Sequence, residues 1–254
     1  MSEARTARRK RILLLGGTGD SRALAERLAG RRDVEVISSL AGRTEQPATI
    51  PGGLRIGGFG GVDALADYLT QTGIDLVVDA THPYAARISA NAEAACRKTA
   101  TPRLLLSRPP WQEVAGDRWI RVPDAAAAAA ALPGLASRVF LAVGRGELEA
   151  FAGLPRIWFL VRTVDAPREK LPLETCEVVL GRGPFEESGE RALFLLHGIQ
   201  ALVTKNSGGE ATYAKIAVAR ELGLPVVMIE RPPHSEQETA GSIAEAIEWI
   251  DTQL

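Results

Sequence analysis

The sequence predicts an α/β protein with two doubly wound domains, each built on a mostly parallel sheet. Three observations favour this class. Residues 11–22 run from an apolar segment into glycines and a helix start, strand-like and helix-like segments alternate from there onward, and a second such series follows Pro133 and Gly134. We therefore expect domains at residues 1–134 and 135–254, with the last helix packing on either one. Ligands of such folds bind at the carboxyl ends of the strands, so we expect the site in a cleft between the domains.

The elements of the first domain follow from apolar runs and from their end signals. Short runs rich in Ile, Leu and Val predict buried strands, and helical spacing of apolar residues predicts the helices between them. Asp63 is the expected N-cap of one helix, and Gly73 is its expected end. The expected strands cover residues 12–15, 34–38, 54–56, 74–78 and 103–106, and the expected helices follow Gly19, follow Asp63 and cover residues 85–97.

The second domain repeats the alternation. Ahead of it, the alanine run 125–131 is expected to form a short helix with Asp124 as its N-cap. Apolar residues at helical spacing over residues 243–250 indicate a final helix. The expected strands cover residues 139–143, 157–161, 178–180, 201–204 and 226–229, and the other expected helices cover 147–151, 187–196 and 211–222.

The composition favours a folded cytoplasmic protein that binds neither membranes nor nucleic acid. The chain has 254 residues, of which 46% are hydrophobic, and its formal net charge is -1. No apolar run approaches the ~18 residues of a membrane helix. Cys96 and Cys176 stand alone, and the three histidines lack ligand spacing, so we expect neither a disulfide framework nor a metal. The oligomeric state is left open by the sequence.

A glycine turn follows the first apolar strand. Gly16, Gly17, Thr18 and Gly19 lead into a helix that starts with Asp20 and Ser21. Backbone N–H groups of such a turn are expected to face an anion, as in dinucleotide-binding folds. The fingerprint is partial because Arg22 stands where the third glycine of G-x-G-x-x-G would be. A purely structural strand-to-helix turn is the alternative.

The second strand favours NADPH over NADH. NAD-binding folds commonly place an Asp or Glu about 20 residues after the glycines, where it binds the ribose 2′-hydroxyl. Ser38 and Ser39 occupy this place, and Arg43 follows within reach of a 2′-phosphate. The alternative for Arg43 is a solvated loop residue.

Polar residues also follow the fourth strand, in the segment Asp79-Ala80-Thr81-His82-Pro83-Tyr84-Ala85. Side chains at this position of a doubly wound sheet can reach both a nicotinamide and a substrate. His82 could donate a proton or bind a carboxylate. Alternatively, Asp79 and His82 only satisfy neighbouring backbone groups.

A third group of candidate residues follows a strand of the second domain. Backbone amides, a hydroxyl and two ammonium groups are expected to form an anion-binding mouth there. For Lys215 the alternative is an exposed helix charge, and Arg108 and Arg145 are more simply explained as solvated charges. The mouth comprises Lys205, Asn206, Ser207, Gly208, Gly209 and Lys215, with Arg182 and Arg231 at comparable strand ends.

Several chemistries lack their sequence patterns. The chain has no G-x-S-x-G elbow, no G-x-x-x-x-G-K loop and no Tyr followed four residues later by Lys. Hydride transfer requires only a positioned cofactor and substrate, so these absences are compatible with a reductase.

Taken in order, these motifs resemble the precorrin-6A reductase family of cobalamin biosynthesis over nearly the whole chain. The resemblance implies two Rossmann-like domains and the use of NADPH to reduce one double bond of the precorrin-6A macrocycle, which gives precorrin-6B. Its alternatives are a reductase of the cobalt-containing macrocycle and a non-catalytic NADPH-binding regulatory module. The matching segments are LLLGGTGDSRALA, AGRT, IGGFGG, DATHPYA, RPPW, GRGPF, TKNSGG with AKIAVA, and PVVMIERP.

The resemblance also suggests roles for the candidate residues. The cofactor phosphates are expected on residues 16–21, the 2′-phosphate on Ser38 and Arg43, and the nicotinamide near Thr81 and His82. The proton donor is left open among His82, Tyr84, Lys205 and a held water. The substrate is a polycarboxylate, and its expected contacts are Thr81, His82, Arg87, Arg182, Lys205, Asn206, Ser207, Gly208, Gly209, Lys215 and Arg231.

Overall fold

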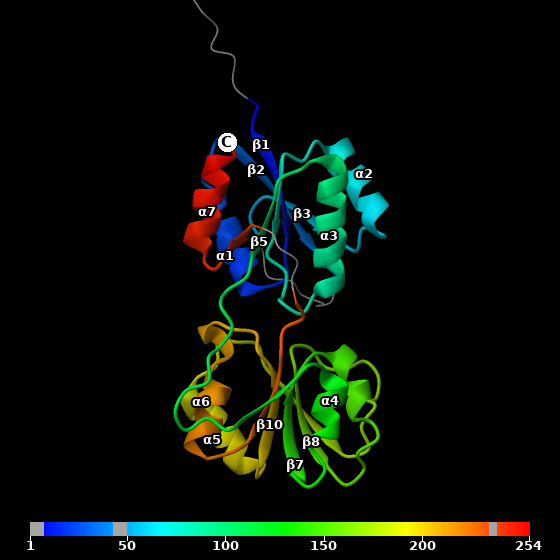
Figure 1. Ribbon diagram of the computed structural model, residues 1–254, viewed down its shortest axis with the longest axis vertical. Coiled ribbons are helices and arrows are strands. Elements are labelled where there is room, and N and C mark those ends of the chain that lie inside the picture. Colours follow the sequence, from blue (N-terminus) through cyan, green and yellow to red (C-terminus); the bar gives the residue numbers. More distant parts are fainter. Residues whose placement is uncertain (1–7, 43–49, 234–237) are drawn as a thin grey trace, which may run out of the picture. The chain divides into compact units, whose positions relative to one another are not determined.

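The chain folds into two compact units (Figure 1), which a computed structural model describes over residues 8–42, 50–233 and 238–254. Unit 1 comprises Met1–Arg108 and Pro233–Leu254, and unit 2 comprises Pro109–Pro232. Each unit contains a six-stranded sheet with helices between the strands, and neighbouring strands are parallel. The predicted class, two doubly wound α/β domains, is therefore confirmed. Among the described residues, no helix is both long and apolar enough to cross a membrane.

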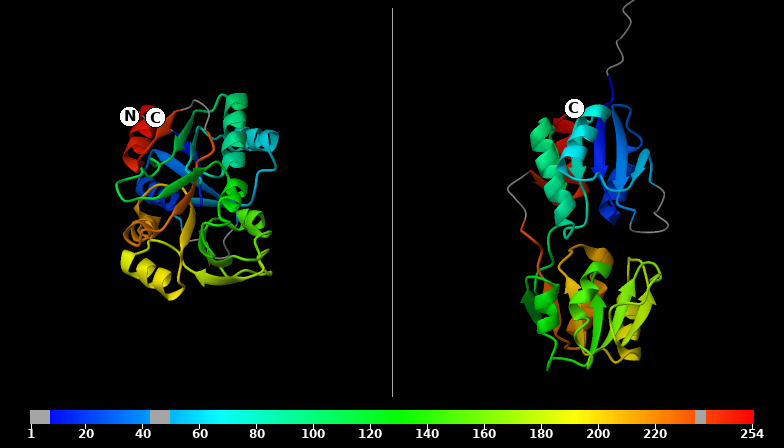
Figure 2. Two further views of the ribbon diagram at one scale, coloured as in Figure 1. Left: turned by 60° about the horizontal axis from the view of Figure 1, so that its bottom comes forward. Right: turned by 90° about the vertical axis from the view of Figure 1, so that its right-hand side faces the viewer.

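The sheet of unit 1 has the strand order β3-β2-β1-β4-β5-β12. Helices α1 and α7 lie on one face of the sheet, and α2 and α3 lie on the other (Figures 1 and 2). Ile12 and Leu14 of β1 pack with the first pair of helices and Leu13 and Leu15 with the second, so apolar side chains bury both faces. The elements are β1 (Lys10–Leu15), α1 (Gly19–Leu28), β2 (Val34–Leu40), β3 (Gly53–Ile56), α2 (Val62–Thr72), β4 (Leu76–Asp79), α3 (Ala86–Thr99), β5 (Arg103–Leu106), β12 (Thr239–Ala240) and α7 (Ile243–Thr252).

The sheet of unit 2 has the order β9-β8-β7-β10-β11-β6. Its core includes Phe140, whose ring packs edge-on against Phe194 at 5.4 Å between centroids. The elements are β6 (Trp119–Val122), α4 (Ala125–Ala130), β7 (Arg138–Ala142), the 3₁₀ helix η1 (Arg145–Phe151), β8 (Trp158–Thr163), β9 (Cys176–Leu180), α5 (Glu187–Leu196), β10 (Ala201–Lys205), the 3₁₀ helix η2 (Glu210–Thr212), α6 (Ala214–Glu221) and β11 (Val226–Ile229).

The division between the units differs from the expected boundary at residues 134 and 135. The chain leaves unit 1 after Arg108 and returns to it at Pro233. Strand β6, which the sequence did not predict, pairs with β11 and so belongs to unit 2. Strand β12, also not predicted, pairs with β5, and the last helix packs its buried residues into the core of unit 1. Unit 1 therefore takes an edge strand from the distant carboxyl-terminal segment, whereas unit 2 is one continuous segment whose first strand lies at the edge of its sheet.

Two of the predicted helix ends agree with the structure and one does not. Asp124 caps α4 by accepting a hydrogen bond from Ala127 N at 2.8 Å, and Gly73 ends α2 with φ 63°. Asp63 is not an N-cap: Gly61 holds that position, and Asp63 lies in the first turn, where it pairs with Lys98 at 2.8 Å. A carboxylate in the first turn still favours the helix through its dipole.

Candidate active site

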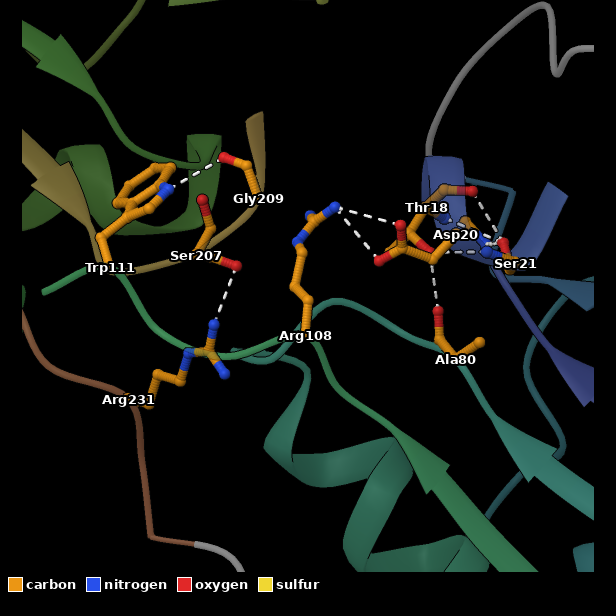
Figure 3. Close-up of polar contacts among 10 residues, drawn as sticks. Thr18, Asp20, Ser21, Ala80, Arg108, Trp111, Ser207, Gly209 and Arg231 are labelled. Atoms are coloured by element: carbon orange, nitrogen blue, oxygen red, sulfur yellow. Dashed lines mark hydrogen bonds and ion pairs between the residues drawn. The ribbon is translucent and has the colours of Figure 1, made fainter. Parts of the chain in front are cut away.

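The glycine turn of unit 1 is closed by hydrogen bonds of its own side chains (Figure 3). Thr18 caps α1 by accepting a bond from Ser21 N at 3.1 Å, and Ser21 Oγ accepts from Gly17 N and Thr18 N, both at 3.1 Å. Gly16 N also donates, to Ser39 O at 2.9 Å, so the expectation that the turn presents free N–H groups is wrong for Gly16, Gly17 and Thr18. The N–H groups of Gly19 and Asp20 are the first of α1 and have no acceptor inside the helix. They remain available to an anion.

An arginine neutralises the acid at the start of α1. Arg108, which follows β5, pairs with the Asp20 carboxylate at 3.1 Å (Figure 3). An unpaired carboxylate in this first turn would repel a phosphate bound at the helix N-terminus. The pair removes that repulsion. No local sequence pattern indicates this role, because Arg108 lies far from Asp20 along the chain.

The end of β2 carries the two serines of the expected ribose site. Ser38 is only 1% exposed, and its hydroxyl has no hydrogen-bond partner among the described residues. Ser39 is also buried, and its Oγ lies 3.4 Å from Arg55 Nη1. Arg43, the other expected 2′-phosphate ligand, falls outside the described residues. Binding of this phosphate by Ser38 and Arg43 stays a prediction.

The segment after β4 is organised by a buried carboxylate. Asp79 is fully buried and accepts hydrogen bonds from Arg103 Nη2 and Thr81 Oγ1, both at 2.7 Å. Thr18 Oγ1 donates to Ala80 O at 2.8 Å and so ties the glycine turn to this segment (Figure 3). Strands β1 and β4 are the pair at which the strand order of the sheet reverses. The structure thus brings Thr18 and Thr81 to one place, while Asp79 acts as the support of Thr81.

His82 and Tyr84 lie next to each other in the same segment. Tyr84 N donates to His82 Nδ1 at 3.3 Å, and the two rings lie 5.6 Å apart. An Nδ1 that accepts a hydrogen bond leaves the proton of a neutral imidazole on Nε2. His82 is therefore held in the tautomer that can donate from Nε2. Arg87, another expected substrate contact, is exposed in the first turn of α3.

In unit 2, Lys205 stands at the end of β10 and forms an ion pair with Glu147. Glu147 also accepts a hydrogen bond from Gly144 N at 2.6 Å. Strands β7 and β10 are again the pair at which the strand order reverses. The Lys205 ammonium is therefore held beside a carboxylate of the chain itself, a pairing that was not expected from the sequence. The sequence feature that could have indicated this ion pair is the acidic residue of the G-R-G-E segment after β7.

The next residues of this loop are fixed by Trp111 and Arg231. Buried Asn206 accepts from Trp111 N at 2.7 Å and donates to Trp111 O at 3.2 Å. The Trp111 indole N–H donates to Gly209 O at 2.8 Å, and Arg231 donates to Ser207 O (Figure 3). Arg231 also donates to Asn206 O at 2.7 Å. Asn206 and Arg231 thus shape the loop. Any substrate contact of theirs stays a prediction.

Lys215 does not lie on an exposed rim. Its residue is 5% exposed within α6, its Nζ donates to Thr212 O, and it lies 4.8 Å from the centre of the Trp111 ring. Burial lowers the pKa of this ammonium to about 7. Both sequence interpretations, an anion ligand in an open mouth and an exposed helix charge, are corrected by this placement. Arg182, in contrast, is exposed in the loop after β9.

The strand order of unit 1 and its glycine turn define a Rossmann-like fold, a class that contains many dinucleotide-binding proteins. Comparison with known proteins is more specific. The family model described as precorrin-6x reductase CbiJ/CobK matches residues 11–251. The chain belongs to this family of oxidoreductases.

Individual relatives agree over nearly the full length. The precorrin-6A reductase of Rhodococcus erythropolis is 48% identical over 95% of this chain and 98% of its own, and that of Rhodobacter capsulatus is 45% identical over 94% and 95%. A cobalt-precorrin-6A reductase of Priestia megaterium is 33% identical over 87% of this chain and 90% of its own. The solved structure of a CobK precorrin-6A reductase superposes with a TM-score of 0.91 at 45% identity, over 96% of this chain and 97% of that one.

Proposed function

We propose that the protein reduces one double bond of the precorrin-6A macrocycle with NADPH and so forms precorrin-6B in cobalamin biosynthesis. The observation that carries this proposal is near-full-length identity of 45% to 48% with precorrin-6A reductases, against 33% with the cobalt-precorrin-6A reductase of Priestia megaterium. The metal-free macrocycle is therefore the proposed substrate. The resemblance seen in the motifs points the same way.

The residues of unit 1 fit a dinucleotide. The free N–H groups of Gly19 and Asp20 would bind the pyrophosphate, and Arg108 would cancel the charge of Asp20 beside it. Thr81, held by Asp79, would orient the nicotinamide, which supplies the hydride when the cofactor is bound. An ion pair fixes Arg108 and a hydrogen bond fixes Thr81 before any ligand arrives, so little ordering of these side chains is needed on binding.

Exposed cations fit a polycarboxylate substrate. Arg87 and Arg182 are both exposed, so their guanidinium groups could reach carboxylates of a macrocycle. The loop at Ser207–Gly209 would add hydrogen-bond donors whose positions are set by Trp111 and Arg231. Charge-assisted hydrogen bonds of this kind would fix the orientation of the macrocycle.

The reduced bond also needs a proton on its second carbon. We assign this proton to His82, whose ring is held in one orientation by Tyr84 N; the donor form is the imidazolium, which becomes neutral when the proton leaves. Tyr84 and Lys205 are the remaining side-chain candidates. Lys205 is the weaker of these two because Glu147 already forms an ion pair with its ammonium.

The reaction is tested with purified protein, NADPH and precorrin-6A under anaerobic conditions. We expect the visible spectrum of the macrocycle to lose conjugation while NADPH is consumed in equal amount. A parallel assay with the cobalt-containing macrocycle should show slower turnover. NADPH binding without consumption in either assay would favour the non-catalytic regulatory module.

The role of His82 is tested with His82→Gln. We expect kcat to fall by about 10²- to 10⁴-fold, with little change in the Kd for NADPH, because only the proton transfer is removed. His197→Gln serves as the control, since His197 ends α5 and stacks on Trp158 in unit 2. Unchanged turnover of His82→Gln would remove this residue as the donor.

A further inference from the structure

Arg55 occupies a defined place on the edge of the unit 1 sheet. It lies on β3, the outermost strand, directly opposite Ser39 of β2. Gly57 N donates to Leu40 O at 2.8 Å, so the carboxyl ends of β2 and β3 are held side by side. The guanidinium of Arg55 is therefore anchored at the carboxyl end of β2.

Neutral groups hold this guanidinium in one orientation. Arg55 Nη1 donates to Gly57 O at 2.5 Å and lies 3.4 Å from Ser39 Oγ, and Nη2 donates to Gly58 O at 2.9 Å. Its central carbon lies 3.8 Å from the centre of the Phe59 ring, at stacking distance. These contacts use three of the five N–H donors of an arginine, and two remain. The side chain is fixed before any ligand binds.

Arg55 has no acidic partner among the residues that the structure describes. All of its hydrogen-bond acceptors are neutral oxygens, although the side chain is partly buried. Two other sheet arginines are paired: Arg103 with buried Asp79, and Arg162 with buried Glu190. Arg138, the first residue of β7, likewise donates to a neutral backbone oxygen, so the missing carboxylate is not sufficient by itself. Arg55 differs in its place, because ligands of doubly wound sheets bind at the carboxyl ends of the strands, where an anion from outside the chain can reach its remaining N–H donors.

We propose that Arg55 binds the 2′-phosphate of NADPH and is the residue that selects this cofactor over NADH. In dinucleotide folds the adenine ribose lies over the carboxyl end of β2, where NAD-binding proteins place a carboxylate. Here that strand end carries Ser38 and Ser39, and the Arg55 fork stands beside Ser39. A planar guanidinium with two open N–H donors matches a phosphate in a bidentate fashion. This assignment rests on the proposed use of NADPH.

A purely structural role makes a different prediction. Arg55 also braces the Gly57–Gly58 backbone, so its loss could loosen the loop between β3 and α2. A loosened loop would weaken the binding of NADPH and NADH alike. Loss of a 2′-phosphate ligand would weaken NADPH alone, because NADH carries a hydroxyl at that position. The ratio of the two affinities separates the roles.

The test measures the Kd of NADPH and of NADH by calorimetry for wild type, Arg55→Met, Arg55→Lys and a control. Adenosine 2′,5′-bisphosphate and AMP serve as a second pair of probes that differ only in the 2′-phosphate. The control is Arg32→Met, which removes an exposed arginine just before β2, at the opposite end of the same strand. Thermal unfolding of each variant checks the fold.

For Arg55→Met we expect NADPH affinity to fall about 10- to 100-fold with NADH affinity unchanged. Arg55→Lys keeps the charge but loses the planar pair of N–H donors, so its NADPH affinity should lie between those of Arg55→Met and wild type. Equal weakening of both cofactors, or an unchanged ratio, would overturn the role of Arg55 while leaving NADPH as the cofactor. A wild type that does not prefer NADPH would overturn both the role of Arg55 and the proposed cofactor.

Discussion

Lys215 illustrates how burial changes a single side chain. Its ammonium lies in an apolar helix against Trp111, with Thr212 O as its hydrogen-bond acceptor. Glu190 favours the charged form and Arg162 opposes it, but burial dominates and lowers the pKa to about 7. A side chain that would be a charged surface group on most helices is thus close to half neutral near pH 7.

This pKa predicts a pH dependence of stability. Below pH about 7 the folded and unfolded states both carry the proton, so the cost of burying the charge is fully present. Between pH about 7 and the ordinary lysine pKa of 10.5, only the unfolded state keeps the proton on Lys215. The free energy of unfolding therefore rises with pH in this range, by up to about 1.4 kcal/mol per pH unit. Lys215→Met should remove this rise. Urea unfolding from about pH 6 to about pH 9 measures it, and identical slopes for both proteins would contradict it.

At the scale of an element, the loop after β10 is held by close packing of its backbone against Pro109 as well as by hydrogen bonds. Gly208 has φ +68°, and a Cβ built there would lie 2.1 Å from Pro109 O and 2.7 Å from Arg231 Nη2. Only glycine fits this position, because both the conformation and the space exclude a side chain. The loop and the segment that begins unit 2 are therefore packed as one piece.

Gly208→Ala should destabilise the protein by about 2 to 4 kcal/mol, since it adds both backbone strain and a clash with a carbonyl oxygen. Gly189→Ala is the matched control. Gly189 lies in α5, and a Cβ there would meet no atom within 4 Å. We therefore expect Gly189→Ala to raise the free energy of unfolding by up to about 1 kcal/mol. Denaturant unfolding of both variants measures the difference. Similar stabilities would show that the loop adapts to the added methyl.

For the whole molecule, the chain passes between the units twice. The carboxyl-terminal strand and helix complete unit 1, where Ala246 and Ile250 are fully buried in the same core as β1 and β5. Strand β6 in turn completes the sheet of unit 2 beside β11. Folding of unit 1 therefore needs residues from both ends of the chain.

Ile250→Ala tests this arrangement. Truncation of a fully buried isoleucine should cost about 2 to 5 kcal/mol, and amide exchange should accelerate in β1, β4 and β5 of unit 1. Strands β7 and β10 of unit 2 should keep their protection. Glu248→Ala, an exposed neighbour on α7, should change neither. Faster amide exchange in β7 and β10, and not in β1, β4 and β5, would contradict the packing of α7 in the core of unit 1.

The parts of the fold that could be predicted have local causes. Strands buried on both faces, such as β1, β4 and β11, are continuous apolar runs and are visible in the sequence. Strand β6, with an arginine at its third position, and the two-residue β12 carry no such signal. They exist because a neighbouring strand offers backbone partners. The boundary at residues 134 and 135 was misplaced for the same reason.

The candidate site divides along the same line. The sequence determined the α/β class, the glycine turn and the polar segment after β4, because each depends on residues adjacent in the chain. Only the tertiary structure decided which groups can bind a ligand. Ser21 accepts hydrogen bonds from two N–H groups of the turn, and Glu147 pairs with Lys205. Lys215 is buried, and Arg55 has no carboxylate partner among the described residues. Exposure and charge pairing depend on residues distant in sequence, so no local pattern contains them.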